Sequence, residues 1–170
     1  VWAFTRWEQK KPHDYVLQSV FNQGSRTQPH VYDMLETMGF DIIRESDRPT
    51  RWKLKSGAEL SGRIDGKIRG FRGEKFLAPR LLEMKTAAAH TFDAVNTVDD
   101  LKTAEAHYVR SYYAQGQAYC LLEELNEGLF VLYSKATGLL KLIPFELDYA
   151  FAESLLARID RLQPFVAGSI

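Results

Sequence analysis

The sequence contains very little cysteine. Cys120 is the only cysteine among 170 residues, so it has no partner for a disulfide bond within the sequence. A single thiolate also cannot by itself hold a zinc ion or an iron–sulfur cluster. We therefore exclude a disulfide-stabilised fold and a cysteine-ligated metal centre, and we expect a reducing, intracellular environment.

The sequence also lacks a long hydrophobic run and an excess of one charge. No segment approaches the roughly 18 consecutive apolar residues that a membrane-spanning helix needs, and residues 1–7 do not resemble a signal peptide. Twenty-two basic residues balance twenty-two acidic residues, so an anionic partner would have to meet a local patch. With 45% hydrophobic and 26% charged residues, we expect a globular protein without a membrane span and a single domain over residues 1–170.

Apolar residues recur every three or four positions in several segments, which is typical of amphipathic helices. The predicted helices are residues 12–21, 28–38, 98–125 and 146–162. Turn-forming residues at 22–25 separate the first two helices.

Other segments have the alternation or the composition of strands. The predicted strands are residues 40–44, 59–68, 80–86, 129–134 and 139–145. The second and third strands are expected to form a hairpin across a turn region at 69–79, and the last two form another hairpin. A loop is expected at 45–51. Helices and strands that alternate in this way indicate an α/β fold.

Two acidic residues and a lysine lie on the first predicted hairpin. Glu83 and Lys85 are two residues apart on one strand, so they point to the same face, and Asp65 can face them from the neighbouring strand. Because Leu81 and Leu82 lead directly into Glu83, we expect a buried strand, where a lone carboxylate is costly without a metal or a partner.

Converging carboxylates are the hard oxygen ligands that Mg²⁺ or Mn²⁺ prefers. A lysine beside such an ion can orient or deprotonate a water molecule, while the ion withdraws charge from a phosphorus centre. The pattern therefore predicts a metal-dependent phosphodiesterase. The alternative is an exposed network of salt bridges with no chemical role.

The predicted helix over residues 98–125 carries a stripe of tyrosine and glutamine. Tyr108, Tyr112, Gln115, Tyr119 and Leu122 follow one another at steps of four, three, four and three, so they share one face. This face could simply pack on the sheet. Tyrosine rings can also stack on unpaired bases, and nearby cations can hold phosphates, which suits single-stranded or frayed DNA. The basic residues near the hairpin and the helix are Arg63, Lys67, Arg69, Arg72, Lys75, Lys102, His107 and Arg110.

Three short motifs occur in a characteristic order over about residues 60–122. They are Gly62-Arg63-Ile64-Asp65, Glu83-Met84-Lys85 and Gln115-Gly116-Gln117-Ala118-Tyr119. In order and spacing they resemble the Gly-x-x-Asp, Glu-x-Lys and Gln-x-x-x-Tyr motifs of the PD-(D/E)XK nuclease superfamily, in its RecB-like and phage exonuclease branch. The resemblance implies a mixed central sheet flanked by helices, the restriction-endonuclease-like nuclease core. It also implies a metal-dependent deoxyribonuclease, an exonuclease on single-stranded or frayed DNA ends in recombination, repair or phage replication.

The resemblance also implies roles for individual residues. Asp65 and Glu83 would bind Mg²⁺ or Mn²⁺, the backbone carbonyl of Met84 could be a further ligand, and Lys85 would serve the attacking water. The remaining residues implied in catalysis or in holding nucleic acid are Gln115 and Tyr119 over the site, with Arg63, Lys67, Tyr108 and Tyr112 around it.

Members of this branch commonly carry a His or Glu on an early helix as a further metal ligand. In this sequence Gln28 stands at the usual position. His30 follows two residues later, and Glu36 is a third candidate. The resemblance therefore leaves the choice between Gln28 and His30 open.

The cofactor and the setting follow from the same resemblance. Relatives with an iron–sulfur cluster need four cysteines, so a chain with Cys120 alone resembles the cluster-free members. These imply an intracellular enzyme, in a bacterial or phage-infected host cytoplasm, and some processive exonucleases of similar fold assemble into rings. The alternative function is a non-catalytic nucleic-acid-binding or assembly module that retains the nuclease fold.

Overall fold

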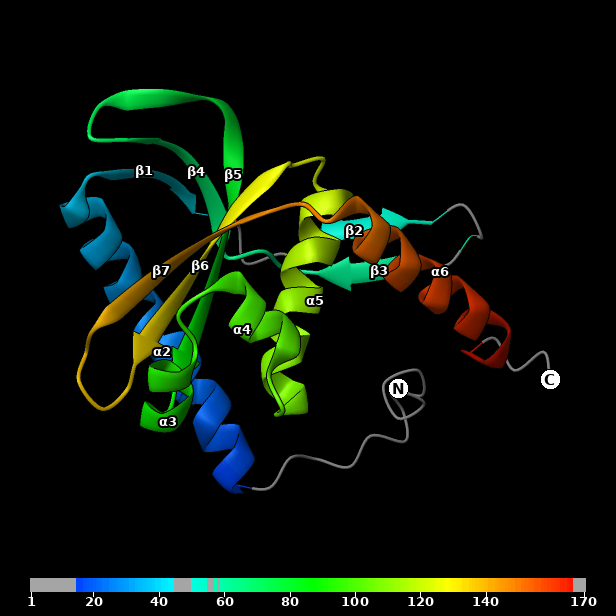
Figure 1. Ribbon diagram of the computed structural model, residues 1–170, viewed down its shortest axis with the longest axis horizontal. Coiled ribbons are helices and arrows are strands. Elements are labelled where there is room, and N and C mark those ends of the chain that lie inside the picture. The colour runs from blue at the N-terminus through cyan, green and yellow to red at the C-terminus, as the bar shows by residue number, and fades with distance from the viewer. Residues whose placement is uncertain (1–14, 45–49, 55–56, 58, 167–170) are drawn as a thin grey trace.

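The computed structural model describes residues 15–44, 50–54, 57 and 59–166, which form a mixed α/β fold (Figure 1). The central sheet has five strands in the order β1-β4-β5-β6-β7. The strands of this sheet are β1 (Phe40–Arg44), β4 (Gly66–Phe71), β5 (Glu74–Ala87), β6 (Glu127–Ser134) and β7 (Leu140–Glu146). The β5–β6 pair is parallel and the other three pairs are antiparallel, so the expected mixed sheet is confirmed.

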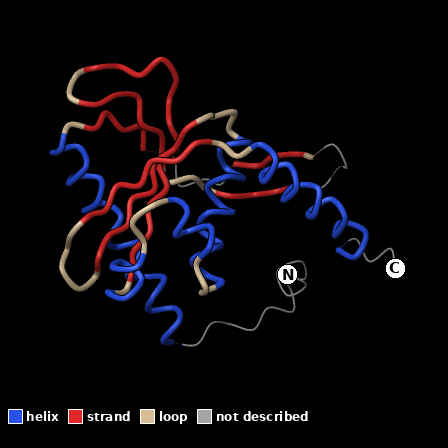
Figure 2. Tube along the Cα trace, in the orientation of Figure 1, coloured by secondary structure: helices blue, strands red, loops and turns tan. Residues whose placement is uncertain are grey.

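Helices lie on both sides of this sheet (Figure 2). The described helices are α2 (Tyr15–Met38), α3 (Ala89–Ala94), α4 (Val98–Thr103), α5 (His107–Leu122) and α6 (Tyr149–Val166). On one face, Val31 and Leu35 of α2 share a core cluster with Leu82 of β5. On the other face, Val109 of α5 shares a second cluster with Leu81. The consecutive leucines of β5 therefore point into opposite layers, as the period of two requires.

The segment predicted as a single strand over residues 59–68 is divided between two sheets. Its first part is β3 (Glu59–Gly62), which pairs with β2 (Thr50–Lys53) in a separate two-stranded sheet, and its last part begins β4 at Gly66. Ile64 belongs to the core cluster on the α5 face, whereas Ile68 belongs to the cluster on the α2 face. The alternation of side chains between the two faces is therefore interrupted at residues 63–65, where the chain leaves one sheet and joins the other.

Two other predicted boundaries on the amino-terminal side are wrong. The turn predicted at 22–25 is absent, because α2 is continuous across Gly24 and Pro29. A Cβ atom on Gly24 would lie 3.9 Å from Thr86 Oγ1, so α2 passes close to the end of β5 at this point. The turn predicted at 69–79 shrinks to Arg72 and Gly73, both at positive φ, as in a tight hairpin, and the rest extends β4 and β5.

The long helix predicted over 98–125 is also wrong, since it is two helices separated at residues 104–106. Thr97 begins α4 with a capping box to Asp100, as expected for a helix start there. At the break, the Arg110 guanidinium donates hydrogen bonds to the main-chain carbonyls of Ala104 and Glu105, which end α4. The break contains neither glycine nor proline, so the sequence gives no local signal for it.

The remaining expectations agree with the structure to within a few residues. The second hairpin is present as β6 and β7, and the final helix begins at Tyr149 and continues to Val166. Residues 12–14 of the first predicted helix and residues 45–49 of the predicted loop lie outside the described residues, while residues 50 and 51 begin β2. None of the described helices is long and apolar enough to cross a membrane.

Candidate active site

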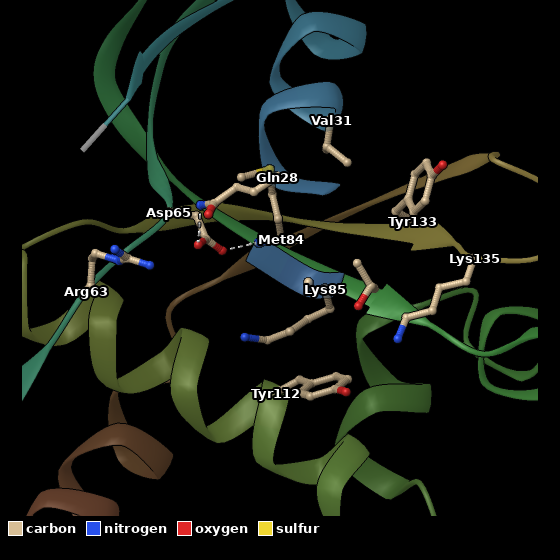
Figure 3. A pocket seen from close by; sticks show the side chains of 11 residues that line it. Gln28, Val31, Arg63, Asp65, Met84, Lys85, Tyr112, Tyr133 and Lys135 are labelled. Carbon is tan, nitrogen blue, oxygen red and sulfur yellow. Dashed lines mark hydrogen bonds between the residues drawn. The ribbon is translucent and has the colours of Figure 1, made fainter. Parts of the chain in front are cut away.

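Asp65 lies at the break between β3 and β4, where two neighbouring elements bind its side chain. Its Oδ2 accepts a hydrogen bond from the backbone N–H of Met84 on β5 at 2.6 Å, and its Oδ1 accepts one from Gln28 Nε2 on α2 at 2.9 Å (Figure 3). The Tyr32 hydroxyl donates to the main-chain carbonyl of Asp65. Burial raises the pKa of Asp65, although the Met84 N–H and the charge of Lys85 oppose the shift.

Glu83 and Lys85 form a buried ion pair on β5. Lys85 Nζ donates to Glu83 Oε1, as the spacing of two residues on a strand predicts, and to Gln115 Oε1 at 2.9 Å. Glu83 is only 1% exposed, and burial raises its pKa to about 7 against the opposing charge of Lys85. Burial alone would lower the pKa of Lys85, but the ion pair with Glu83 outweighs it, so that pKa is raised.

One oxygen of this ion pair is unsatisfied. Glu83 Oε2 is buried and has no hydrogen-bond partner among the described residues. A buried carboxylate oxygen without a partner is costly, so this atom is suited to an external proton or cation. Asp65 lies near enough for its charge to raise the pKa of Glu83. Because both Asp65 oxygens accept hydrogen bonds, Glu83 Oε2 is the carboxylate oxygen of this pair that is left without a hydrogen bond among the described residues, and a hard divalent cation suits such an oxygen.

The donor set is small. Within the ranges that the structure describes, no group of three or more His, Cys, Asp and Glu side chains could hold a metal ion. The ligand set that the resemblance implies, namely Asp65, Glu83 and the main-chain carbonyl of Met84, stays a prediction. Mg²⁺ commonly binds through one or two carboxylates and keeps several waters, so this set suits Mg²⁺ or Mn²⁺ with open positions for substrate.

Helix α5 contributes a polar stripe to this site, as its spacing predicts. Gln115 accepts from Lys85 and donates through Nε2 to the Tyr119 hydroxyl at 3.1 Å. Lys85 Nζ lies 5.3 Å from the centroid of the Tyr112 ring, and the Tyr108 ring lies 6.1 Å beyond Tyr112. The stripe therefore faces the buried ion pair and does not merely pack on the sheet.

The glycine of the first motif makes room for the tyrosine of the third. A Cβ atom on Gly62 would lie 2.7 Å from the Tyr119 hydroxyl oxygen, closer than real Cβ atoms approach. Trp52 of β2 packs on the same tyrosine, with ring centroids 5.9 Å apart. The small hairpin of β2 and β3 is thereby joined to α5 at the motif residues.

A pocket of about 390 Å³ opens beside these residues (Figure 3). We call it the Asp65 pocket, and its lining residues are Gly24, Gln28, Val31, Arg63, Asp65, Met84, Lys85, Thr86, Tyr112, Tyr133 and Lys135. Three of them are cations and one is a carboxylate, so the lining favours an anionic ligand. Glu83 does not line the pocket, but Lys85 joins it to the lining.

Of the two early-helix candidates, Gln28 contacts Asp65 and lines the Asp65 pocket. His30 is exposed, lies edge-on to Tyr133 at 6.0 Å between ring centroids, and does not line the pocket. Glu36 instead pairs with Arg44 on the surface.

Several predicted nucleic-acid contacts lie elsewhere. Lys67 forms an ion pair with Glu123 at 2.8 Å and does not line the Asp65 pocket, whereas Arg63 does. The Tyr108 hydroxyl is within hydrogen-bond distance of Thr91 Oγ1, at 2.8 Å, and the ring is 48% exposed. The remaining basic residues lie at the projecting end of the β4–β5 hairpin or on the other side of α5: Arg69, Arg72, Lys75, Lys102, His107 and Arg110.

Lys135 and Thr86 also line the pocket, although neither was among the predicted site residues. They meet because β5 and β6 are parallel, so that both strands end at the same edge of the sheet, where Lys135 N bonds to the Ala87 carbonyl. Ligands often bind where parallel strands end. The available signal was the helical segment between the two strands, which is typical of a parallel crossover.

Comparisons with known proteins give a likeness in fold. No family model matches the sequence, and no curated protein matches it significantly. The structure is similar to the crystal structure of LHK-Exo in complex with dAMP, with a TM-score of 0.61 and 14% identity over 98% of this chain and 76% of that chain. At this identity the likeness shows a shared fold, a mixed sheet flanked by helices.

Two further crystal structures are similar at lower scores. The alkaline exonuclease LHK-Exo from Laribacter hongkongensis gives a TM-score of 0.46 at 18% identity, over 88% of this chain and 75% of that chain. SSO0001 gives 0.48 at 18% identity over 83% of this chain. This chain spans 59% of the length of SSO0001.

Proposed function

We propose that this chain is a divalent-metal-dependent DNA nuclease of the PD-(D/E)XK superfamily, in the RecB-like and phage exonuclease branch. The observation that carries the proposal is the unsatisfied oxygen of buried Glu83, in an ion pair with Lys85 and beside Asp65. The fold shared with LHK-Exo, an alkaline exonuclease whose structure was determined with dAMP, supports it. The finer proposal is an exonuclease on single-stranded or frayed ends, in recombination, repair or phage replication in a bacterial or phage-infected host cytoplasm.

In this proposal, Asp65, Glu83 and the carbonyl of Met84 hold Mg²⁺ or Mn²⁺. When bound, such an ion polarises a phosphodiester and lowers the pKa of a coordinated water. Glu83 and Gln115 fix the Lys85 ammonium group, and the raised pKa of Lys85 keeps that group protonated. Lys85 therefore orients the attacking water or a phosphate oxygen as a hydrogen-bond donor, and it does not act as a base while it stays paired.

The same proposal assigns the DNA to the Asp65 pocket. Arg63 and Lys135 supply cations for phosphates, and Tyr112 supplies a ring next to Lys85 on which an unpaired base can stack. Tyr119 acts through Gln115 as a positioning residue for Lys85. Lys67 is left out of this assignment because it pairs with Glu123.

The test is a time course on end-labelled DNA, single- and double-stranded, linear and circular, with Mg²⁺ or Mn²⁺. We expect cleavage of linear DNA that stops in chelator and is lost in the folded Lys85→Ala variant. Lys75→Ala is the matched control, since Lys75 lies on the same strand but pairs with Asp41 at the exposed end of the hairpin. Cutting of circles would exclude an enzyme that requires ends.

A second candidate is a non-catalytic nucleic-acid-binding module with the same fold. The closed Glu83–Lys85 ion pair favours it, because a salt bridge needs no metal. Such a module would bind DNA equally well in Mg²⁺ and in chelator, and would cleave none in either.

A further inference from the structure

Helix α5 borders a second hollow on the side away from the Asp65 pocket. This hollow, the α5–α6 groove, has a volume of about 380 Å³ and shares no lining residue with the pocket. Leu155, Ile159 and Leu162 of α6 line it at helical spacing, and each is half-buried. Helix α6 therefore presents an aliphatic stripe that the described part of the chain leaves partly exposed.

The edges of the α5–α6 groove are basic. Arg110, Arg158, Lys102 and His107 line it, and no described Asp or Glu side chain does. Lys102 is paired with Asp148 at 3.2 Å, a carboxylate that does not line the groove. The Arg110 guanidinium binds two main-chain carbonyls, which carry no net charge, and Arg158 forms no ion pair within the described residues. Two guanidinium charges at an apolar floor are thus without a carboxylate partner.

We infer that the α5–α6 groove docks a short segment of a partner protein in which large apolar side chains are flanked by carboxylates. Apolar side chains would cover Leu155, Ile159 and Leu162, while carboxylates would pair with Arg110 and Arg158. The stripe from 155 to 162 is about 10 Å long at the helical rise, which matches about two turns of an amphipathic helix.

Charge complementarity alone would also allow a nucleic acid, but the floor of the groove argues against one. Unpaired bases bind by stacking on exposed aromatic rings. Of the aromatic rings on this floor, Tyr113 is only 4% exposed, and it packs on the half-buried Phe151 ring at 4.8 Å between centroids. The other half-buried residues of the floor include the aliphatic Leu155, Ile159 and Leu162, so most of this surface suits peptide side chains better than stacked bases. This inference does not depend on the proposed function.

The experiment pans a phage-displayed library of random peptides of about twelve residues against the folded full chain. We expect enriched peptides to combine a net negative charge with at least two large apolar residues. Fluorescence anisotropy with synthetic copies should show binding that Arg158→Glu weakens by about tenfold or more, because like charges would then face each other. Arg161→Glu is the matched control: it makes the same change on α6 at an exposed residue that does not line the groove, and it should leave affinity unchanged.

Four results would overturn the inference. They are a failure to enrich peptides, peptides that bind Arg158→Glu as tightly, displacement of the peptides by single-stranded DNA without metal, or self-association of the chain that Arg158→Glu abolishes. Circular dichroism of each variant establishes that it is folded, and Ile159→Ser tests the aliphatic stripe independently of charge.

Discussion

The two sides of α5 carry opposite arrangements of charge. On the pocket side, Glu83 and Lys85 are buried and bonded to each other, and Gln115 of α5 completes the contact. On the groove side, Arg110 and Arg158 line an apolar floor, and no Asp or Glu from the described part of the chain lines it with them. Charges that are buried must find partners within the fold, whereas charges at an accessible edge can be left for a ligand.

The two sides of α5 also differ in what a ligand could add to them. On the pocket side, Glu83 Oε2 is the buried side-chain atom that has no hydrogen-bond partner among the residues that the structure describes. On the groove side, the described residues leave Leu155, Ile159 and Leu162 only half-buried. A missing contact to one buried oxygen suits a small cation, and a missing surface suits a macromolecular segment. Substitutions on the two sides should therefore change different measurable properties.

The largest expected effect is on the pocket side. Glu83→Gln keeps the size of the side chain but removes the charge that would hold the cation, so cleavage should fall by about 10³-fold. Single-turnover rates in Mn²⁺ measure it. Glu127→Gln, at an exposed glutamate that pairs with Arg80, is the matched control and should keep the wild-type rate. A Glu83→Gln rate close to that of the wild type would remove Glu83 from the site.

The next effect is on the pH dependence of stability without metal. Glu83 has a pKa of about 7 in the folded chain against 4.5 as its ordinary value, so between these values the folded chain holds a proton that the unfolded chain has released. The free energy of unfolding should therefore fall as the pH rises from about 4.5 to about 7, by about 3 kcal/mol. The raised pKa of Asp65 acts in the same direction.

Urea unfolding in chelator at several pH values between about 5 and 8 measures this slope. Glu83→Gln should remove most of it, because the amide does not titrate. In saturating Mn²⁺ the free energy of unfolding should instead rise with pH, since the cation stabilises the ionised carboxylates. A free energy of unfolding that rises with pH in chelator would contradict the raised pKa of Glu83.

The motif residues could be predicted from local rules. The period of two places Glu83 beside Lys85, and the steps of three and four place Gln115 beside Tyr119, whatever the rest of the chain does. Lys135 could not be predicted in this way, because it reaches the pocket only through the pairing of β5 with a strand far along the chain. The reset of alternation at 63–65 likewise depends on which sheet each half of the segment joins.

The choice between Gln28 and His30 was within reach of the sequence. Gln28, Tyr32 and Leu35 follow at steps of four and three, and Leu35 is fully buried, so Gln28 lies on the face of α2 that packs on the sheet. His30 is two residues, or about 200°, away around the helix. The helix predicted over residues 28–38 already contains all three residues, so the predicted turn at 22–25 did not prevent this choice.

A smaller effect is expected when a charge is added at that position. Gln28→Glu would give Asp65 and Glu83 a third carboxylate as neighbour, so the chain should bind Mn²⁺ about tenfold more tightly. Isothermal titration measures this. His30→Glu adds the same charge on the same helix at an exposed residue and should leave the affinity unchanged. Equal gains from both would mean that only the overall charge matters.

The smallest expected effects come from removing one tyrosine hydroxyl on each side of α5. The Tyr119 hydroxyl accepts from Gln115 at 3.1 Å, and the Tyr113 hydroxyl donates to Asp148 at 3.3 Å. Tyr119→Phe and Tyr113→Phe should each lower the free energy of unfolding by about 1 kcal/mol, since each removes one hydrogen bond. Cleavage should fall by about fivefold in Tyr119→Phe alone, in kcat and not in KM, because only that hydroxyl is joined to Lys85 through Gln115. Equal losses of cleavage in both variants would mean that α5 acts on the reaction through its stability, and the two sides of the helix would then not be functionally distinct.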